Sequence, residues 1–216
     1  MKKLFLASYF SGAASAFTAF AGDCNGKKVA FIPTASLPEK MSFYVGADRK
    51  ALLKLGMEVE DLEVSTAATG EIEAKIAAAD CIFVSGGNTF FLLQELRRTG
   101  ADKLIAAHIE IGKLYIGASA GSMVLAPNIE YVKHMDKPTD APELNGDFAA
   151  LGIVPFSVVP HFANFPFKKA TEKIVASYSG TLDLRPIANH QAVTVVGDKI
   201  EVVSAEAKKK AAKEKK

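Results

Sequence analysis

One serine in the middle of the chain lies in a context that can make it a nucleophile. Residues 113–124 read KLYIGASAGSMV, so a short apolar run at 114–116 leads directly into a G-x-S-x-G motif centred on Ser119. A strand, this turn and a helix start form a nucleophile elbow, which exposes the serine hydroxyl beside a base. The backbone N–H of Ala120 can then stabilise an oxyanion. The same motif also occurs in glycine-rich turns without chemistry, so both interpretations remain open here.

The elements around this serine alternate between strand and helix patterns. Apolar or β-prone runs predict strands over residues 29–32, 59–64, 81–84, 114–116, 151–159, 184–187 and 192–196. Helical spacing of apolar residues predicts helices over residues 39–55, 71–79, 90–98, 101–111, 122–126 and 168–178. This order predicts an α/β fold, a doubly wound, mostly parallel sheet with helices on both faces. Gly197-Asp198 is typical of a two-residue turn and predicts a C-terminal β-hairpin.

Two glycine-rich turns follow buried strands of this predicted sheet. Gly86 and Gly87 come directly after residues 81–84, and the motif around Ser119 comes after residues 114–116. Asn88 or Thr89 then caps the next helix. Sites in doubly wound sheets lie outside the carboxyl ends of the strands, so both turns fall where a site is expected.

The composition is that of one ordinary globular domain. The chain has 216 residues and a formal net charge of +2, and its length suits one sizeable core. Residues 207–216 hold six Lys and one Glu, so we expect one domain over residues 1–206 and a basic, frayed tail. The body has no basic patch and no span long enough for a membrane, which argues against nucleic-acid and membrane partners. Residues 127–146 lack periodicity and are expected to form a loop such as a lid.

The cysteines and histidines give no case for a metal or a cofactor. Cys24 and Cys81 are too few for a disulfide framework and lack zinc-ligand spacing, which favours a reducing compartment. No H-E-x-x-H spacing occurs. We expect His108 at the surface or at an interface, His134 in the lid, and His190 either beside the site or in a turn.

The first 22 residues allow two interpretations. Two lysines, an apolar stretch at 4–10 and Ala-Phe-Ala at 19–21 resemble a secretory signal peptide. The alternative is a first strand over residues 3–7, a polar turn, and a helix over residues 13–21 with Phe17 and Phe20 facing the sheet. The second interpretation keeps the protein in the cytoplasm.

Four segments occur together in one order and spacing. They are GGNTFFLLQELRRTG, YIGASAGS, Pro160-His161-Phe162, and NHQAV at residues 189–193. In combination they resemble the peptidase E (aspartyl dipeptidase) family of serine peptidases, which includes the cyanophycinases. The resemblance extends over about residues 2–203. It implies a class I glutamine amidotransferase-like (flavodoxin-like) fold and favours the first-strand interpretation of residues 3–7.

The resemblance also implies roles for individual residues. Ser119 matches the nucleophile, and His161 matches the general base that takes its proton and returns it to the leaving amine. The backbone N–H groups of Gly87 and Ala120 match the oxyanion hole. A serine-type peptidase that hydrolyses dipeptides or small peptides is therefore expected.

The third triad position departs from the family pattern. Well-studied members have Glu or Asp there, whereas this chain has Asn189. An amide oxygen can accept the imidazole Nδ1–H, as in Cys-His-Asn proteases, so Asn189 is the expected third member. Should Asn189 only cap a turn, Asp136 or Asp183 becomes the candidate.

Substrate contacts are the least defined part of the prediction. Aspartyl dipeptidases of the family read the acidic side chain with an arginine after the Pro-His-Phe segment, and residues 163–171 contain none. Lys168 and Lys169 are the nearest cations and, with Asn88, are the candidate substrate-binding residues. A small peptide is the expected partner, with a weaker preference for aspartate, and the protein is expected to be a monomer or a homodimer. A related amidase or isopeptidase and a non-catalytic binding module remain the alternatives.

Overall fold

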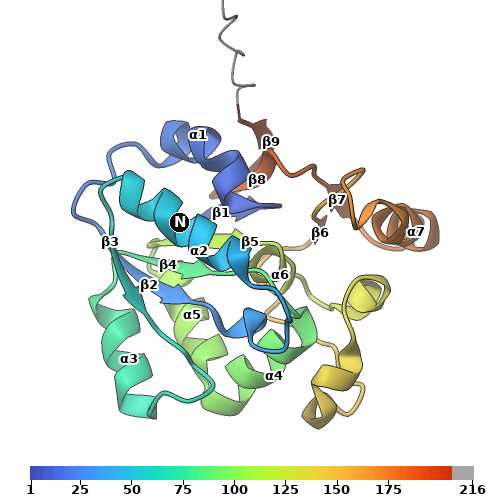
Figure 1. Ribbon diagram of the computed structural model, residues 1–216, viewed down its shortest axis with the longest axis horizontal. Helices are drawn as coiled ribbons and strands as arrows, with labels where there is room; N and C mark the ends of the chain where they lie inside the picture. Colours follow the sequence, from blue (N-terminus) through green and yellow to red (C-terminus); the bar gives the residue numbers. More distant parts are fainter. Residues whose placement is uncertain (206–216) are drawn as a thin grey trace, which may run out of the picture.

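A sheet of seven strands runs through the centre of the molecule (Figure 1). The computed structural model describes residues 1–205. In spatial order the strands are β3 (Glu58–Asp61), β2 (Lys28–Ile32), β4 (Cys81–Val84), β5 (Leu114–Ala118), β1 (Lys3–Ala7), β8 (Gln191–Val196) and β9 (Lys199–Ser204). The first five are parallel to one another, and the β8–β9 hairpin adds antiparallel to β1. The predicted mostly parallel α/β fold with a C-terminal hairpin is confirmed.

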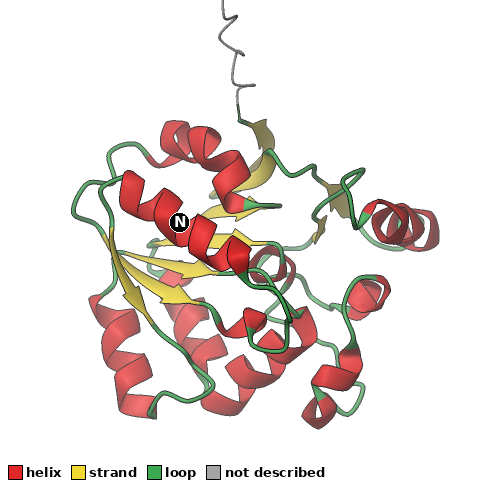
Figure 2. Ribbon diagram, in the orientation of Figure 1, coloured by secondary structure: helices red, strands yellow, loops and turns green. Residues whose placement is uncertain are grey.

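Helices cover both faces of this sheet (Figure 2). One face carries α1 (Phe10–Ala21) and α2 (Phe43–Lys54), and the other carries α3 (Thr69–Ala78), α4 (Thr89–Thr99) and α5 (Ala101–Glu110). Successive side chains of a strand point to opposite faces. Leu6 of β1 therefore joins the core under α4 and α5, whereas Phe5 joins the core under α1.

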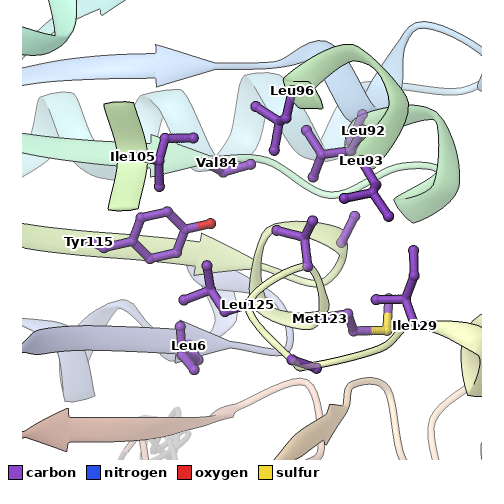
Figure 3. Packing of buried hydrophobic residues seen from close by; sticks show 14 of the residues in the cluster. Leu6, Val84, Leu92, Leu93, Leu96, Ile105, Tyr115, Met123, Leu125 and Ile129 are labelled. Carbon is purple, nitrogen blue, oxygen red and sulfur yellow. The ribbon is translucent and has the colours of Figure 1, made fainter. Parts of the chain in front are cut away.

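The larger core explains why the central strands are apolar without interruption. Figure 3 shows Leu6 of β1, Val84 of β4 and Tyr115 of β5 in one layer against leucines of α4 and Ile105 of α5. Every residue of β4 and β5 is buried. A strand that packs against helices on both faces has no exposed side and so cannot show polar alternation.

The first residues of the described chain form part of the sheet. β1 pairs with β5 on one side and β8 on the other, so residues 3–7 occupy the predicted strand. The helix that follows begins at Phe10, three residues earlier than expected. Phe5 contacts the rings of Phe10 and Phe17 edge-on, at 6.4 and 5.1 Å between centroids. This aromatic packing fixes α1 against β1.

Further predicted elements differ from the structure, among them the strand predicted over 59–64, which is β3 and ends at Asp61. The helix predicted over 39–55 begins only at Phe43, because residues 34–36 form a 3-10 turn, η1 (Thr34–Ser36), and Pro38 lies in the loop that follows. The helix after the elbow, α6 (Ala120–Met123), is shorter than expected.

Residues 151–154 are irregular, since their N–H groups donate to the carbonyls of residues 124–126. Only β6 (Ser157–Val159) forms from the predicted strand 151–159, and it pairs with β7 (Leu184–Pro186) in a separate small sheet. The helix α7 (Lys168–Tyr178) lies between β6 and β7 in the chain.

The predicted loop over residues 127–146 is packed onto the body. It forms three short 3-10 helices, η2 (Glu130–His134), η3 (Pro138–Asp140) and η4 (Pro142–Leu144). Asp136 accepts hydrogen bonds from the N–H and hydroxyl of Thr89 at 2.8 and 2.6 Å. The buried side chain of Tyr131 donates to the carbonyl of Val158 at 2.8 Å. These contacts hold the segment against the start of α4.

Within residues 1–205, no helix is both long and apolar enough to cross a membrane. The expected basic tail, residues 207–216, lies outside the described residues, and so does the predicted domain boundary at residue 206.

Candidate active site

Ser119 occupies a strained turn between β5 and α6. Its φ of 48° and ψ of −105° are unfavourable for a residue with a side chain. The turn is held because the Ser119 N–H donates to the carbonyl of Ala7 at 3.0 Å, linking the elbow to β1. A Cβ on Gly121 would lie 2.2 Å from the carbonyl oxygen of Val84, and one on Gly117 would lie 2.5 Å from that of Gly121. The two glycines of the motif are therefore required by backbone packing.

His161 faces this serine from the loop after β6. Its Nε2 lies 3.0 Å from Ser119 Oγ, within reach of a proton transfer. The backbone of His161 has a φ of 60°, so this residue is strained as well. The ring of Phe167 stacks on the imidazole at 4.9 Å between centroids and fixes its plane.

Asn189 contacts the far side of the imidazole. Its Oδ1 lies 2.6 Å from Nδ1 of His161. With this oxygen as acceptor, Nδ1 carries the proton and Nε2 keeps the lone pair that faces Ser119. The backbone N–H of Asn189 donates to Oδ1 of Asn164 at 2.9 Å, which holds the turn in place. The arrangement has the geometry of a Ser-His-Asn triad.

Ser8 joins this network and was not expected from the sequence. It is fully buried at the carboxyl end of β1. Its Oγ accepts a hydrogen bond from the N–H of His161 at 2.7 Å and donates to Oδ1 of Asn189 at 3.3 Å. Its place one residue beyond the first strand, at the edge where such folds bind ligands, was the available signal.

The backbone N–H groups of Gly87 and Ala120 are the candidates for the expected oxyanion hole. Gly87 has a φ of 136°, and a Cβ there would lie 2.0 Å from the carbonyl oxygen of Ala35. Only glycine fits this position. In the described chain, neither the N–H of Gly87 nor that of Ala120 donates to a backbone carbonyl. Two free donors beside a nucleophile match the requirement for stabilising a tetrahedral intermediate.

One cavity of about 300 Å³ lies beside Ser119, and Ala120 is not among the residues that line it. Ser119, His161, Asn189 and Gly87 all line it. Phe43 and Phe165 lie at its mouth with 74% and 92% of their surface exposed. The cavity thus has a polar floor at the serine and an apolar rim.

The protonation state of His161 suits a general base. Burial lowers its pKa from the ordinary value of 6.5, and the hydrogen bond with Asn189 offsets part of that lowering. The imidazole is therefore neutral near pH 7 and able to accept a proton.

The three candidate substrate-binding residues lie outside the cavity lining. Asn88 is buried and caps α4, because its Oδ1 accepts from the N–H groups of Phe90 and Phe91 at 3.0 and 3.1 Å. Its Nδ2 donates to the segment over residues 137–140. Lys168 and Lys169 are exposed on the first turn of α7. The structure brings none of the three to Ser119.

The remaining histidines also lie away from the cavity. His108 is buried, so the expectation of a surface residue is wrong. Its Nε2 lies 3.3 Å from the carbonyl of Leu114. Residues 101, 105, 108 and 109 form the apolar face of α5, and helical spacing places His108 among them. His134 packs near the ring of Tyr178, and His190 is exposed in the turn before β8.

The two alternative carboxylates do not contact His161. Asp136 is bonded to Thr89, and Asp183 pairs with Arg185 at 2.9 Å. Cys24 and Cys81 are buried free thiols, and burial raises the pKa of Cys81 to about 12. Across residues 1–205, no group of three or more His, Cys, Asp or Glu side chains is arranged to hold a metal ion.

The fold is that of a peptidase family. The family model for Peptidase family S51 matches residues 4–203, and the chain belongs to this family. It is 55% identical over 195 residues to an uncharacterized peptidase of Pasteurella multocida, covering 90% of this chain and 94% of that protein. It is 37% identical over 145 residues to peptidase E of Salmonella arizonae, covering 67% of this chain and 59% of that protein.

A crystal structure supports the same relationship. A protein of Listeria monocytogenes described as a candidate peptidase E superposes with a TM-score of 0.92 at 48% identity, covering 95% of this chain and all of that one. The resemblance to peptidase E inferred from the four segments is confirmed.

Proposed function

We propose that the protein is a serine peptidase that hydrolyses dipeptides or other small peptides through an acyl-enzyme on Ser119. The observation that carries this proposal is the 3.0 Å contact between Ser119 Oγ and His161 Nε2, with Asn189 on the other ring nitrogen. The cavity of about 300 Å³ is at the small end of ligand sites and suits a short peptide.

The reaction follows from these positions. His161 Nε2 takes the hydroxyl proton as Ser119 Oγ bonds to the substrate carbonyl carbon. The N–H groups of Gly87 and Ala120 donate to the oxyanion. The peptide C–N bond then breaks, and His161 returns the proton to the leaving amine. A water, deprotonated by His161, attacks the acyl carbon and releases the acid and free Ser119.

Asn189 acts on the histidine and not on the substrate. Its Oδ1 keeps the proton on Nδ1, so the nitrogen that faces Ser119 stays a base. A neutral amide stabilises the imidazolium less than a carboxylate does, so turnover is expected to be modest. The neutral amide of Asn189 also favours the second candidate function, a non-catalytic binding module that retains the nucleophile-elbow motif. A related amidase or isopeptidase is the remaining alternative.

Labelling and turnover separate these candidates. A fluorophosphonate probe should label Ser119, and a dipeptide panel should show turnover that Ser119→Ala abolishes without loss of the folded state. Ser179→Ala, which removes an exposed hydroxyl directly after the end of α7, is the matched control and should behave as the unmodified protein. No labelling in the folded protein would support the binding module, and turnover only of non-peptide amides would support the amidase.

We also infer that the protein acts in the cytoplasm as a single catalytic domain, as a monomer or a homodimer. The support for the location is β1, which residues 3–7 supply between two other strands. Mass spectrometry of the native protein should find residues 3–7 present. A mature chain that begins at Gly22 or Asp23 would contradict this.

A further inference from the structure

The cavity beside Ser119 is lined by acidic side chains and by no basic ones. Glu39, Asp48 and Asp136 line it, and no Lys or Arg does. Among the described residues, none of these three carboxyl groups forms an ion pair. A cleft with one sign of charge and low-dielectric walls concentrates its field at the bound ligand.

Two of these carboxyl groups are held where ionisation is costly. Asp48 of α2 is 1% exposed, and burial raises its pKa to about 7. Burial likewise raises the pKa of Asp136 to about 6. Both keep fixed positions, because Asp48 accepts from the N–H of Ser11 at 2.9 Å and Asp136 accepts from Thr89. A cation that enters the cavity stabilises their charged forms.

Tyr44 supplies a polar group that has no partner in the folded chain. Its hydroxyl oxygen is buried, and no hydrogen-bond partner for it exists within residues 1–205. The ring lies beside the reacting serine, since a Cβ on Gly86 would be 3.7 Å from Tyr44 Cε2 and 3.2 Å from Ser119 Cβ. Burial and the three carboxyl groups raise the pKa of Tyr44 to about 12, so the hydroxyl stays protonated. A buried hydroxyl without a partner costs free energy that a bound polar group removes.

The mouth of the cavity has a different character. Phe43 and Phe165 expose most of their rings there, and Met135 also lines the cavity. Exposed aromatic side chains at a binding site offer apolar contact area to a ligand. A ligand that matches the whole cavity thus combines a cationic group with an apolar side chain.

We propose that this cavity selects small peptides with a free N-terminal ammonium and a neutral, apolar first side chain, and that it disfavours an acidic first side chain. The inference rests on the proposed function, because it concerns the substrate of the same site. An ammonium next to the reacting carbonyl lies within the field of the carboxyl groups. An acidic side chain at the same residue meets that field with the same sign of charge, which is unfavourable.

Two dipeptides of the same shape test this. Asn-Leu and Asp-Leu differ at the first side chain by one charge, and kcat/KM for Asn-Leu should exceed that for Asp-Leu by about tenfold or more. Leu-Leu should be a better substrate than Asp-Leu, and N-acetyl-Leu-Leu should be poor because it lacks the ammonium.

Carboxyl-to-amide variants attribute the preference to the cavity. Glu39→Gln, at an exposed position, and Asp48→Asn should each reduce the ratio of Asn-Leu to Asp-Leu turnover. Glu73→Gln removes an exposed carboxylate of α3 outside the cavity and should leave the ratio unchanged. Glu39→Gln keeps the test valid if Asp48→Asn does not fold.

The outcomes separate this inference from the function on which it rests. If Ser119 is labelled and the protein hydrolyses Asp-Leu as fast as Asn-Leu, the inference about the substrate is wrong. The proposed peptidase function then still stands. Absence of both labelling and dipeptide turnover overturns the proposed function and the inference with it. If Glu73→Gln changes the ratio of Asn-Leu to Asp-Leu turnover as much as Glu39→Gln does, the preference does not arise from the cavity.

Discussion

The hydroxyl of Ser8 accepts the backbone N–H of His161 at 2.7 Å. This contact joins the end of the first strand to the residue that faces Ser119. His161 has a φ of 60°, which most side-chain-bearing residues avoid. Because the same hydroxyl also donates to Asn189 Oδ1, Ser8 fixes both the backbone of the histidine and the orientation of the amide.

Ser8→Ala should therefore lower kcat/KM by between about 10-fold and 10²-fold, through displacement of the imidazole. The decrease should fall on kcat, since the Ser8 hydroxyl is bonded to His161 and Asn189, and the rate of fluorophosphonate labelling should fall with it. Ser122→Ala is the matched control. Ser122 is also buried and its hydroxyl donates to the carbonyl of Ala7 at 2.8 Å, but it does not contact His161. If the two variants lose thermal stability and labelling rate equally, Ser8 has only a structural role.

Substitution of Asn189 tests the third position of the triad. Asn189→Asp should raise kcat/KM, because a carboxylate at Nδ1 stabilises the imidazolium formed during attack. Asn189→Leu should lower kcat/KM by about 10²-fold, because it removes the acceptor that holds the tautomer. Steady-state kinetics on one dipeptide measures both effects. Unchanged rates in both variants would exclude Asn189 from the triad.

The pH dependence should report the environment of His161. Burial lowers the pKa of His161 from 6.5, and only the neutral imidazole accepts the serine proton. The acidic limb of kcat/KM should thus rise with pH and reach its midpoint below pH 6.5. In Asn189→Asp the midpoint should move to higher pH, since a neighbouring carboxylate favours the protonated ring. A wild-type midpoint above pH 7 would contradict this environment.

His108 should make the protein less stable in acid. Burial lowers its pKa to about 4, whereas the unfolded chain has the ordinary value of 6.5. Between these values the unfolded state binds the proton and the folded state does not, so the free energy of unfolding falls as pH falls. The loss amounts to about 3 kcal/mol at pH 4.

Urea unfolding at pH 7 and pH 4.5 measures this loss. His108→Gln should show a smaller decrease between the two pH values than the unmodified protein. His190→Gln, at an exposed histidine, should show the unmodified decrease. Equal decreases in all three proteins would exclude His108 as the cause.

Much of the fold was predictable because its signals are local. The apolar runs of β4 and β5 and the period of α7 depend on neighbouring residues, and the structure has them at or near the predicted bounds. The irregular first part of the strand predicted over 151–159 was not predictable in this way. The N–H groups of residues 151–154 donate to the carbonyls of residues 124–126, which follow α6. No local sequence pattern predicts that contact.

The same distinction holds for the candidate site. The expected positions of Ser119, His161 and Asn189 follow motifs, and the structure brings these three side chains together. Ser8 has no motif, because its role arises from a contact with a residue 153 positions away. His108 is different, since the apolar period of its own helix indicates burial.

The place of β1 in the sheet determines when this molecule can become complete during translation. β1 leaves the ribosome first, yet its neighbours are β5 and β8, and β8 begins only at Gln191. At typical elongation rates, β1 waits roughly ten to forty seconds for β8. The hydroxyl of Ser8 and the amide of Asn189 meet only then. In a nascent chain, the contacts of His161 with Ser119 and Asn189 therefore cannot be complete in the folded sheet until β8 has emerged.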